Sequence, residues 1–238
     1  MSKYKLRIAG FIFKALCYIL IAAIVIFLVW RIIDDANDPK QMDTVIPSSQ
    51  LVDAYGEVGD DLNTYYQKLT KYTRGENNYG YFAITQSLII EDIDQIQFVF
   101  RYNNSTLRYT AEDYSLDAIP SRDDEVYDVS IVVMYDLTPE NEADNDGKTP
   151  DAVRYERFFP SDMLAAKKTL YNYRKFVFDG IEIGEDVIAV YADFYYVGDV
   201  DYDEKPYGSL LLYHYEEKCI EYDLTKNDVR AIESFNKD

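Results

Sequence analysis

The hydrophobic positions of this chain follow three patterns: an unbroken run near the N-terminus, then helical spacing, then alternation with a period of two. From Ile8 to Trp30 the only charged residue is Lys14. At about 1.5 Å rise per residue, a helix of this length extends roughly 34 Å, enough to cross a hydrocarbon core of ~30 Å. The run therefore predicts a transmembrane helix over residues 8–33.

The charges that flank this run differ in sign on its two sides. Lys3, Lys5 and Arg7 precede it, whereas an acidic stretch follows it closely. Positively charged flanks stay on the cytoplasmic side of a membrane. We therefore expect residues 1–7 to form a cytoplasmic tail and everything after Trp30 to lie outside.

A cleaved signal peptide is the alternative interpretation of the run. Signal peptides have an apolar region of about 7–15 residues, followed by small residues at the cleavage site. Here the run ends in bulky residues, from Val29 to Ile33, and Trp30 suits a membrane–water interface. We favour an uncleaved anchor, in which the long stem of Lys14 reaches the cytoplasmic headgroups.

The segment after the run is polar and contains two prolines, which indicates a linker. Spacings of three and four then dominate in residues 51–73 and predict an amphipathic helix, although Gly56 and Gly59 weaken its first half. We expect residues 34–78 to form a linker and a short helical stalk.

Alternation with a period of two begins after this stalk. The predicted strands cover residues 82–90, 96–102, 129–137, 153–159, 170–178, 188–196, 210–215 and 219–224. The last two are expected to form a closing hairpin around Glu216–Lys218. Strands separated by turns, without helical crossovers, are typical of an antiparallel sandwich or barrel. We expect a β-sandwich over residues 79–224.

The tail, residues 225–238, has the pattern of a capped helix. The hydroxyl of Thr225 can accept from the amide of Asp228, and the Asp228 carboxylate can reach back. The expected fold class is thus mainly β. It consists of an N-terminal transmembrane helix, a short helical stalk, an extracytoplasmic antiparallel β-sandwich and a C-terminal helix.

Composition narrows the set of partners. The 238 residues carry a net charge of −19, and residues 1–33 hold five basic and no acidic side chains, so the remaining 205 carry −24. Such a surface repels phosphate, so we expect no nucleic acid partner. It favours cations, basic proteins or neutral glycans, although solubility alone also explains an acidic surface.

The cysteines indicate the compartment. Cys17 lies in the predicted membrane helix and Cys219 in the outer part, so they cannot pair within one inserted chain. An exported domain without disulfides fits a bacterial cell surface better than a eukaryotic secretory route. The overlapping sequons from Asn103 to Thr106 are therefore interpreted as a polar turn.

Motifs for catalysis are weak in this sequence. His214, the single histidine, would have to serve in any Ser-His-Asp triad, but no Gly-x-Ser-x-Gly elbow is present. One histidine and one outer cysteine do not complete a zinc site. We interpret His214 as a packing residue and expect no catalytic residue.

Two short matches to known motifs are incomplete. Gly147-Lys148-Thr149 resembles the end of a phosphate-binding loop, but Glu142 stands where the first glycine belongs. The Ser-x-x-Lys pattern from Ser234 to Lys237 lies in the tail and is interpreted as chance. We expect no cofactor.

Two acidic loops could offer oxygen ligands to a cation. Residues 142–147 imitate the front half of an EF-hand, with Glu142, Asp144 and Asp146 before a glycine, but Val153 stands in place of the bidentate glutamate. The second alternating set consists of Asp199, Asp201 and Asp203. We interpret both loops as solvated and expect no metal site.

Carbohydrate chemistry is the other alternative. The 43 acidic residues offer many carboxylate pairs for a glycosidase, and the sequence singles out none. A sugar-stacking platform could be built from Tyr191, Tyr195, Tyr196 and Tyr202. Half-buried strands favour tyrosine in any case, so packing is the preferred interpretation.

Two segments carry a resemblance. Residues 101–107 (RYNNSTL) and 168–180 (KTLYNYRKFVFDG) resemble uncharacterised membrane-anchored proteins of anaerobic Gram-positive bacteria. The likeness covers residues 80–224. It implies a bacterial cell-surface setting and no particular activity.

The expected protein is a non-enzymatic surface domain that one helix anchors in the lipid bilayer. Its N-terminus is cytoplasmic, and its outer domain contacts a protein or an envelope glycan. The alternative is an extracellular carboxylate-dependent glycan hydrolase or glycan-binding module. A cleft with two carboxylates about 5–10 Å apart would favour the hydrolase.

Overall fold

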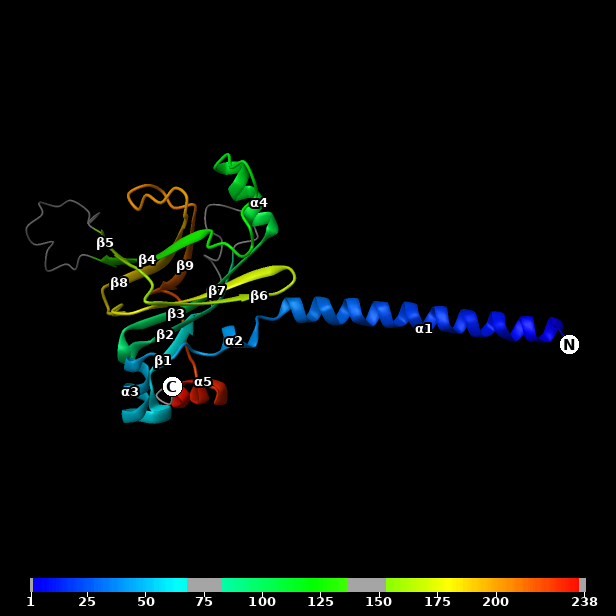
Figure 1. Cartoon of the computed structure of the whole chain (residues 1–238). Coiled ribbons are helices and arrows are strands. Elements are labelled where there is room, and N and C mark those ends of the chain that lie inside the picture. The colour runs from blue at the N-terminus through cyan, green and yellow to red at the C-terminus, as the bar shows by residue number, and fades with distance from the viewer. Residues whose placement is uncertain (1, 68–82, 137–152, 236–238) are drawn as a thin grey trace, which may run out of the picture. The chain divides into compact units, whose positions relative to one another are not determined.

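The structure, a computed structural model, describes residues 2–67, 83–136 and 153–235. The chain divides into two units, Met1–Asp38 and Pro39–Asp238 (Figure 1). The first unit consists of one continuous helix, α1 (Ser2–Ala36). The second contains all of the described strands.

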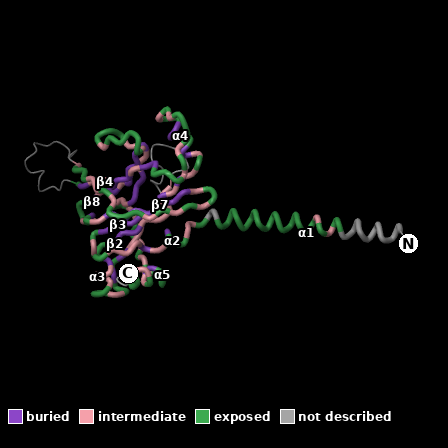
Figure 2. Tube along the Cα trace, viewed as in Figure 1, coloured by how far each residue is buried: buried purple, intermediate pink, exposed green. Residues whose placement is uncertain are grey.

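Helix α1 exposes apolar side chains in all directions between Ile19 and Trp30. Its segment Phe13–Asp34 is long and apolar enough to cross a membrane. Large hydrophobic side chains are exposed at consecutive positions, including Ile19–Ile21 and Ile24–Trp30 (Figure 2). Consecutive helical residues point in different directions, so no polar face is left along this stretch. The helix expected over residues 8–33 is therefore present, and its surface suits an apolar solvent.

The second unit is mainly β and contains two antiparallel sheets in its described residues. The first sheet has the strand order β10-β1-β2-β3-β7-β6. Its strands are β1 (Thr64–Gln67), β2 (Ala83–Ile90), β3 (Gln95–Asn103), β6 (Asp162–Lys167), β7 (Tyr171–Phe178) and β10 (Cys219–Glu221). The second sheet has the order β5-β4-β8-β9. Its strands are β4 (Tyr127–Asp136), β5 (Val153–Phe158), β8 (Val187–Tyr196) and β9 (Gly208–His214).

Short helices precede the first strand, follow the last one and connect some of the strands between them. They are α2 (Lys40–Asp43), α3 (Ser49–Val58), α4 (Asn104–Asp113) and α5 (Lys226–Phe235), with 3-10 turns η1 (Gly59–Asp61) and η2 (Glu91–Ile93). The expected C-terminal helix is confirmed as α5, and so is its cap. The amide of Asp228 donates to Thr225 Oγ1 (3.3 Å), and the amide of Thr225 donates to Asp228 Oδ2 (2.7 Å).

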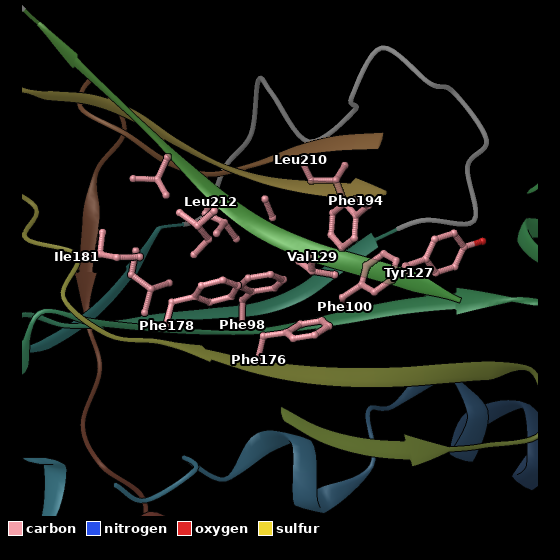
Figure 3. Packing of buried hydrophobic residues seen from close by; sticks show 14 of the residues in the cluster. Phe98, Phe100, Tyr127, Val129, Phe176, Phe178, Ile181, Phe194, Leu210 and Leu212 are labelled. Carbon is pink, nitrogen blue, oxygen red and sulfur yellow. The ribbon is translucent and has the colours of Figure 1, made fainter. Parts of the chain in front are cut away.

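One hydrophobic core joins the two sheets (Figure 3). Its members in β3, β7, β4, β8 and β9 include Phe98, Phe100, Phe176, Phe178, Val129, Ile131, Val133, Val190, Ala192, Phe194, Leu210 and Leu212. The rings of Phe100 and Phe194, one from each sheet, stack with centroids 4.1 Å apart. Burial of this many aromatic and branched side chains is the main source of stability for the fold.

Strand β2 is buried on both faces at its end, and a β-bulge changes which of its residues face the main core. Ile84 pairs with Phe100, but Gln86 pairs with Val99, so one extra residue stands between them. The bulge reverses the alternation. Ile84 and Ile89 consequently pack against the main core, whereas Leu88 and Ile90 enter a second cluster on the opposite face of the sheet. The other buried members of that cluster are Val45, Leu51, Leu62 and Ile232.

The amphipathic helix expected over residues 51–73 is wrong in its second half. α3 ends at Gly59, whose φ of +62° suits glycine. The following residues Thr64–Gln67 form β1, which pairs with β2 and β10. Backbone pairing with two strands outweighs a weak helical spacing. Residues 68–73 lie outside the described part, so the helices described within the expected 34–78 stalk are α2, α3 and η1.

The closing hairpin expected around Glu216–Lys218 is also wrong. β9 pairs with β8 in the second sheet, whereas β10 pairs with β1 in the first. The connection between β9 and β10 therefore passes from one sheet to the other. Its turn is closed by a hydrogen bond from the Glu217 amide to the His214 carbonyl (3.0 Å).

The polar turn expected at residues 103–106 is the start of a helix. Asn103 caps α4, and its Oδ1 accepts from the amides of Ser105 (2.8 Å) and Thr106 (3.1 Å). Thr106 Oγ1 completes a capping box by accepting from the Asn103 amide. Leu107 then buries α4 against the main core. Asparagine and threonine favour turns and helix caps alike, so the local sequence fits both.

Candidate functional site

A cavity of about 670 Å³ lies where β1 and β2 separate. This volume is within the usual range for ligand-binding cavities, about 300–1,000 Å³. The lining comprises Asp43, Val45, Tyr66, Gln67, residues 83–88, Lys175, Leu210, Leu211 and Tyr222. Both sheets, the segment before α3 and the segment before α5 therefore contribute to one space.

Gln67 ends β1, beyond the last residue that pairs with β2. β1 pairs with β2 at Thr64 and Tyr65, whereas its pairing with β10, on its other edge, runs from Tyr65 to Gln67. The Gln67 side chain donates to the carbonyls of His214 (3.1 Å) and Glu217 (3.0 Å) and accepts from the His214 amide (2.9 Å). These bonds hold the end of β1 to the β9–β10 connection.

Thr85, the bulged residue of β2, lines the cavity. Its Oγ1 is buried and has no hydrogen-bond partner in the described residues. A buried hydroxyl without a partner is destabilising by about 1–3 kcal/mol. Bulges often redirect a side chain next to a functional site. Thr85 thus borders the cavity, but its hydroxyl has almost no solvent-accessible surface and is enclosed by the surrounding protein.

Lys175 of β7 is a buried cation at the same cavity. Only 2% of the residue is exposed, and its Nζ donates to the carbonyls of Thr44 (2.7 Å) and Met42 (3.1 Å). Burial lowers the pKa of Lys175 from 10.5 to about 8, against the opposing effects of the Asp228 and Asp43 carboxylates. A neutral amine can make both hydrogen bonds, so the lowered pKa is compatible with this geometry.

Asp228 is a fully buried carboxylate near Lys175. It accepts from the amide of Val45 (2.7 Å), the hydroxyl of Tyr222 (2.9 Å), and the amide and hydroxyl of Thr225 (2.7 and 2.6 Å). Four donors compensate the desolvation of the charge. Burial and the Asp228 carboxylate raise the pKa of Tyr222, so this hydroxyl stays protonated and donating.

The hydrolase alternative requires two carboxylates that face each other. Among the described residues that line the cavity, Asp43 supplies the carboxylate, and no second one accompanies it. The cavity offers hydrogen-bonding groups and apolar walls, which are features of a binding site.

His214 contributes to the turn beside the cavity. Its Nδ1 accepts from the Glu216 amide (3.3 Å), and its ring stacks on Tyr215 with centroids 5.1 Å apart. The residue is half-buried, and through its backbone it holds Gln67.

The candidate tyrosines do not share one surface. Tyr195 and Tyr202 lie together with ring centroids 5.1 Å apart, and the Arg157 guanidinium lies about 5.5 Å from both rings. Tyr196 points to the opposite face of β8, where it packs on Tyr114. Only 3% of Tyr195 is exposed. Its ring therefore packs against neighbours and leaves no open face for stacking on a sugar.

The acidic loops give no ligand set in the described residues. Residues 142–149, with the EF-hand-like and phosphate-loop-like patterns, lie outside them. In the other loop, Asp201 accepts from the Asp203 amide (2.9 Å). The part of the chain that the structure describes holds no group of three or more His, Cys, Asp or Glu side chains arranged for a metal. Of the Ser-x-x-Lys match, Ser234 donates to the Ala231 carbonyl, and Lys237 is not described.

Lys175, Gln67 and Thr85 were not identified from the sequence. A signal was available for Lys175, because it stands in the aromatic stretch Tyr171–Phe178, where a charge is unexpected. Gln67 and Thr85 gave no such signal, since a strand edge accommodates both residue types.

No family model, curated protein or solved structure matches this chain. The geometry of the cavity and the properties of α1 are therefore the basis for assigning a function.

Proposed function

We propose that this chain is a non-enzymatic, membrane-anchored surface domain that binds a protein or glycan of the cell envelope in the cavity between β1 and β2. The observation that carries the proposal is the cavity of about 670 Å³, whose lining combines apolar side chains with the half-buried polar residues Gln86 and Ser87. A binding partner would fill this space.

The anchor is α1, in a single-pass arrangement in the cell membrane. Its apolar surface in all directions between Ile19 and Trp30 supports this role, because such a helix is stable in lipid and aggregates in water. The basic residues Lys3, Lys5 and Arg7 assign the N-terminus to the cytoplasm and the domain after residue 38 to the outside.

The domain is proposed to be a β-sandwich at a bacterial cell surface. The shared core between the two sheets supports the sandwich arrangement. The resemblance of residues 101–107 and 168–180 to surface proteins of anaerobic Gram-positive bacteria supports the setting. Cys17 and Cys219 are both free, which is compatible with it.

The lining indicates which chemistry the partner brings. Val45, Leu210 and Leu211 offer apolar contacts, whereas Gln86 and Ser87 offer polar side chains. The net charge of −24 on residues 34–238 disfavours an anionic partner. A basic or neutral partner with one apolar and one hydrogen-bonding group fits best. This favours binding over the glycan hydrolase, which needs a second carboxylate beside Asp43.

Site-specific photocrosslinking tests the proposal in intact cells that express the full chain. The photoreactive residue p-benzoylphenylalanine replaces Gln86, which lines the cavity, or Ile119, which is exposed and outside it. We expect one defined crosslinked product from position 86 and none from position 119. Ser87→Val, which removes a hydroxyl from the lining of the cavity, should weaken the product. Equal crosslinking from both positions, or none from position 86, contradicts the proposal.

A further inference from the structure

Residues 42–46, named the strap here, lie on the outer face of the first sheet, opposite the main core. Met42 is fully buried against Val99 of β3 and Tyr173 of β7. Val45 enters the second cluster with Leu88 and Ile90 of β2. The strap thus covers three strands with two apolar side chains.

Three buried side chains bind the strap through its backbone. Gln97 of β3 accepts from the Ile46 amide and donates to the Ile46 carbonyl, both at 2.8 Å. Lys175 of β7 donates to two strap carbonyls, and Asp228 of α5 accepts from the Val45 amide. Each of these three side chains belongs to a residue that is at most 2% exposed. The strap is not among the paired strands of the described sheets.

The strap is also part of the wall of the cavity. Asp43 and Val45 line the cavity from the strap, and Lys175 both lines the cavity and binds the strap. The cavity therefore has its present shape only while the strap is bound. A ligand that fills the cavity contacts the strap and favours the bound form.

Release of the strap would cost less free energy than unfolding of the domain. It uncovers Met42 and Val45 together with apolar side chains that they contact, such as Val99 and Tyr173, whereas the main core retains all of its members. It also returns Lys175, Gln97 and Asp228 to water, which compensates part of the lost hydrogen bonding. Segments with few apolar contacts and polar attachments are those that open locally.

From these contacts we infer that the strap releases as a unit while both sheets stay folded, and that a ligand in the cavity holds it bound. By linkage, release of the strap weakens ligand binding to the same extent. The strap follows Pro39 and thus begins the domain directly after the unit that contains α1. The segment that follows the anchor in the chain is therefore ordered when the cavity is occupied and can be released when the cavity is empty. The ligand part of this inference rests on the proposed function.

Hydrogen exchange on the full chain in lipid nanodiscs tests the release. The amides of Val45 and Ile46 report on the strap, and the amide of Ile131 reports on the core. We expect the strap amides to exchange faster than the core amide. Gln97→Leu, which removes both of its hydrogen bonds to the strap and a third to Gln95, should accelerate them about tenfold without changing the core. Lys175→Met provides a second variant with the same expected effect.

Gln41→Leu is the matched control, because Gln41 is exposed and its side chain makes only a long contact to the Ala165 carbonyl (3.5 Å). It should leave the exchange of the strap unchanged. If Val45 and Ile46 exchange together with Ile131 in the parent chain and in both variants, the strap does not open separately and the inference is wrong.

The coupling is tested with an occupant built into the chain. Gln86→Trp and Ser87→Phe each add a large side chain at the lining of the cavity. Filling a cavity stabilises the state that contains it, so strap exchange should slow by about threefold or more. Unchanged or faster exchange in both folded variants overturns the coupling. Slower exchange in these variants without any photocrosslink from position 86 supports the coupling between the cavity and the strap but contradicts the proposed binding partner. Failure of the inference and failure of the proposed function are therefore distinguishable.

Discussion

Lys175 is a buried cation whose two hydrogen-bond partners are uncharged carbonyls. Strand β7 carries it to the outer face of the first sheet, between the strap and α5. The charged groups that face it are the carboxylates of Asp228 in α5 and Asp43 in the strap, and both favour its protonated form. Burial has the larger and opposite effect. The folded protein therefore holds this proton less tightly than the unfolded chain does.

The difference in pKa predicts how stability varies with pH. The folded pKa of about 8 lies below the unfolded value of 10.5, so between these values the unfolded state binds more protons. The free energy of unfolding should rise with pH in this window, by at most about 1.4 kcal/mol per pH unit. Lys175→Met should remove this rise, as measured by urea unfolding at pH 7, 8, 9 and 9.5.

The tyrosines set the upper limit of this measurement. Burial raises the pKa of Tyr127, and both burial and, to a smaller extent, the Asp228 carboxylate raise the pKa of Tyr222. Above pH 10 the unfolded chain therefore loses these protons before the folded protein does, and the free energy of unfolding falls. A constant difference between the parent chain and Lys175→Met from pH 7 to 9.5 would contradict the assignment to Lys175.

Asp228 is the acidic residue among the three that bind the strap, and its substitution should lower the stability of the fold. Asp228→Asn keeps the shape but places an N–H₂ group against donors from Val45, Tyr222 and Thr225. The buried network then contains unmatched donors, and we expect a loss of about 2–4 kcal/mol in the free energy of unfolding. The exposed neighbour Asp223→Asn is the control and should change stability by less than about 0.5 kcal/mol. Equal effects in the two variants would refute the role of Asp228.

At the level of elements, alternation predicted strands where one face is buried. β3, β4, β7 and β8 follow the expected ranges closely, because inward residues such as Phe98, Val133 and Phe194 meet one core. The alternation did not predict β1. It has four residues, it is hydrogen-bonded on both sides, and Tyr65 and Tyr66 suit a helix and a strand equally. The pairing that decides its structure comes from residues far away in the sequence.

The same limit explains why the site was not predicted. The sequence shows neither the bulge at Thr85 nor the contact of Gln67 with the β9–β10 connection, and both residues line the cavity. The cap at Asp228 was predicted, but its hydrogen bond to Val45 spans 183 residues and has no local signal. A helix cap between neighbouring residues can be predicted from the sequence, whereas a hydrogen bond between residues that are distant in the sequence cannot.

The cap of α4 gives a prediction at this scale. Asn103→Ala removes the acceptor for two helix amides and should lower stability by about 1 kcal/mol. Asn104, the next residue, is exposed and lies inside the first turn, so Asn104→Ala should be nearly neutral. Thermal unfolding by circular dichroism measures both. Two equally small effects would show that Leu107 alone fixes the helix.

The whole molecule combines an apolar helix with a strongly acidic domain. Residues 34–238 carry a net charge of −24, so their mutual repulsion should be strongest at low ionic strength. Raising sodium chloride from about 0.01 to 0.1 M shortens the Debye length from ~30 to ~10 Å and should raise the melting temperature. A melting temperature independent of salt would indicate that the charges are already far apart or paired.

Topology is the last consequence of the charge distribution along the chain. Basic residues precede the apolar stretch of α1 and acidic residues follow it, which predicts a cytoplasmic N-terminus. A protease added to intact cells should therefore remove a tag at the C-terminus and leave a tag near Ser2 intact. Reversing the flanking charges, by Lys3→Glu, Lys5→Glu and Arg7→Glu with Asp34→Lys and Asp35→Lys, should protect the C-terminal tag in a fraction of the molecules. A C-terminal tag that is protected in the parent chain would place the cavity on the cytoplasmic side and exclude an envelope partner.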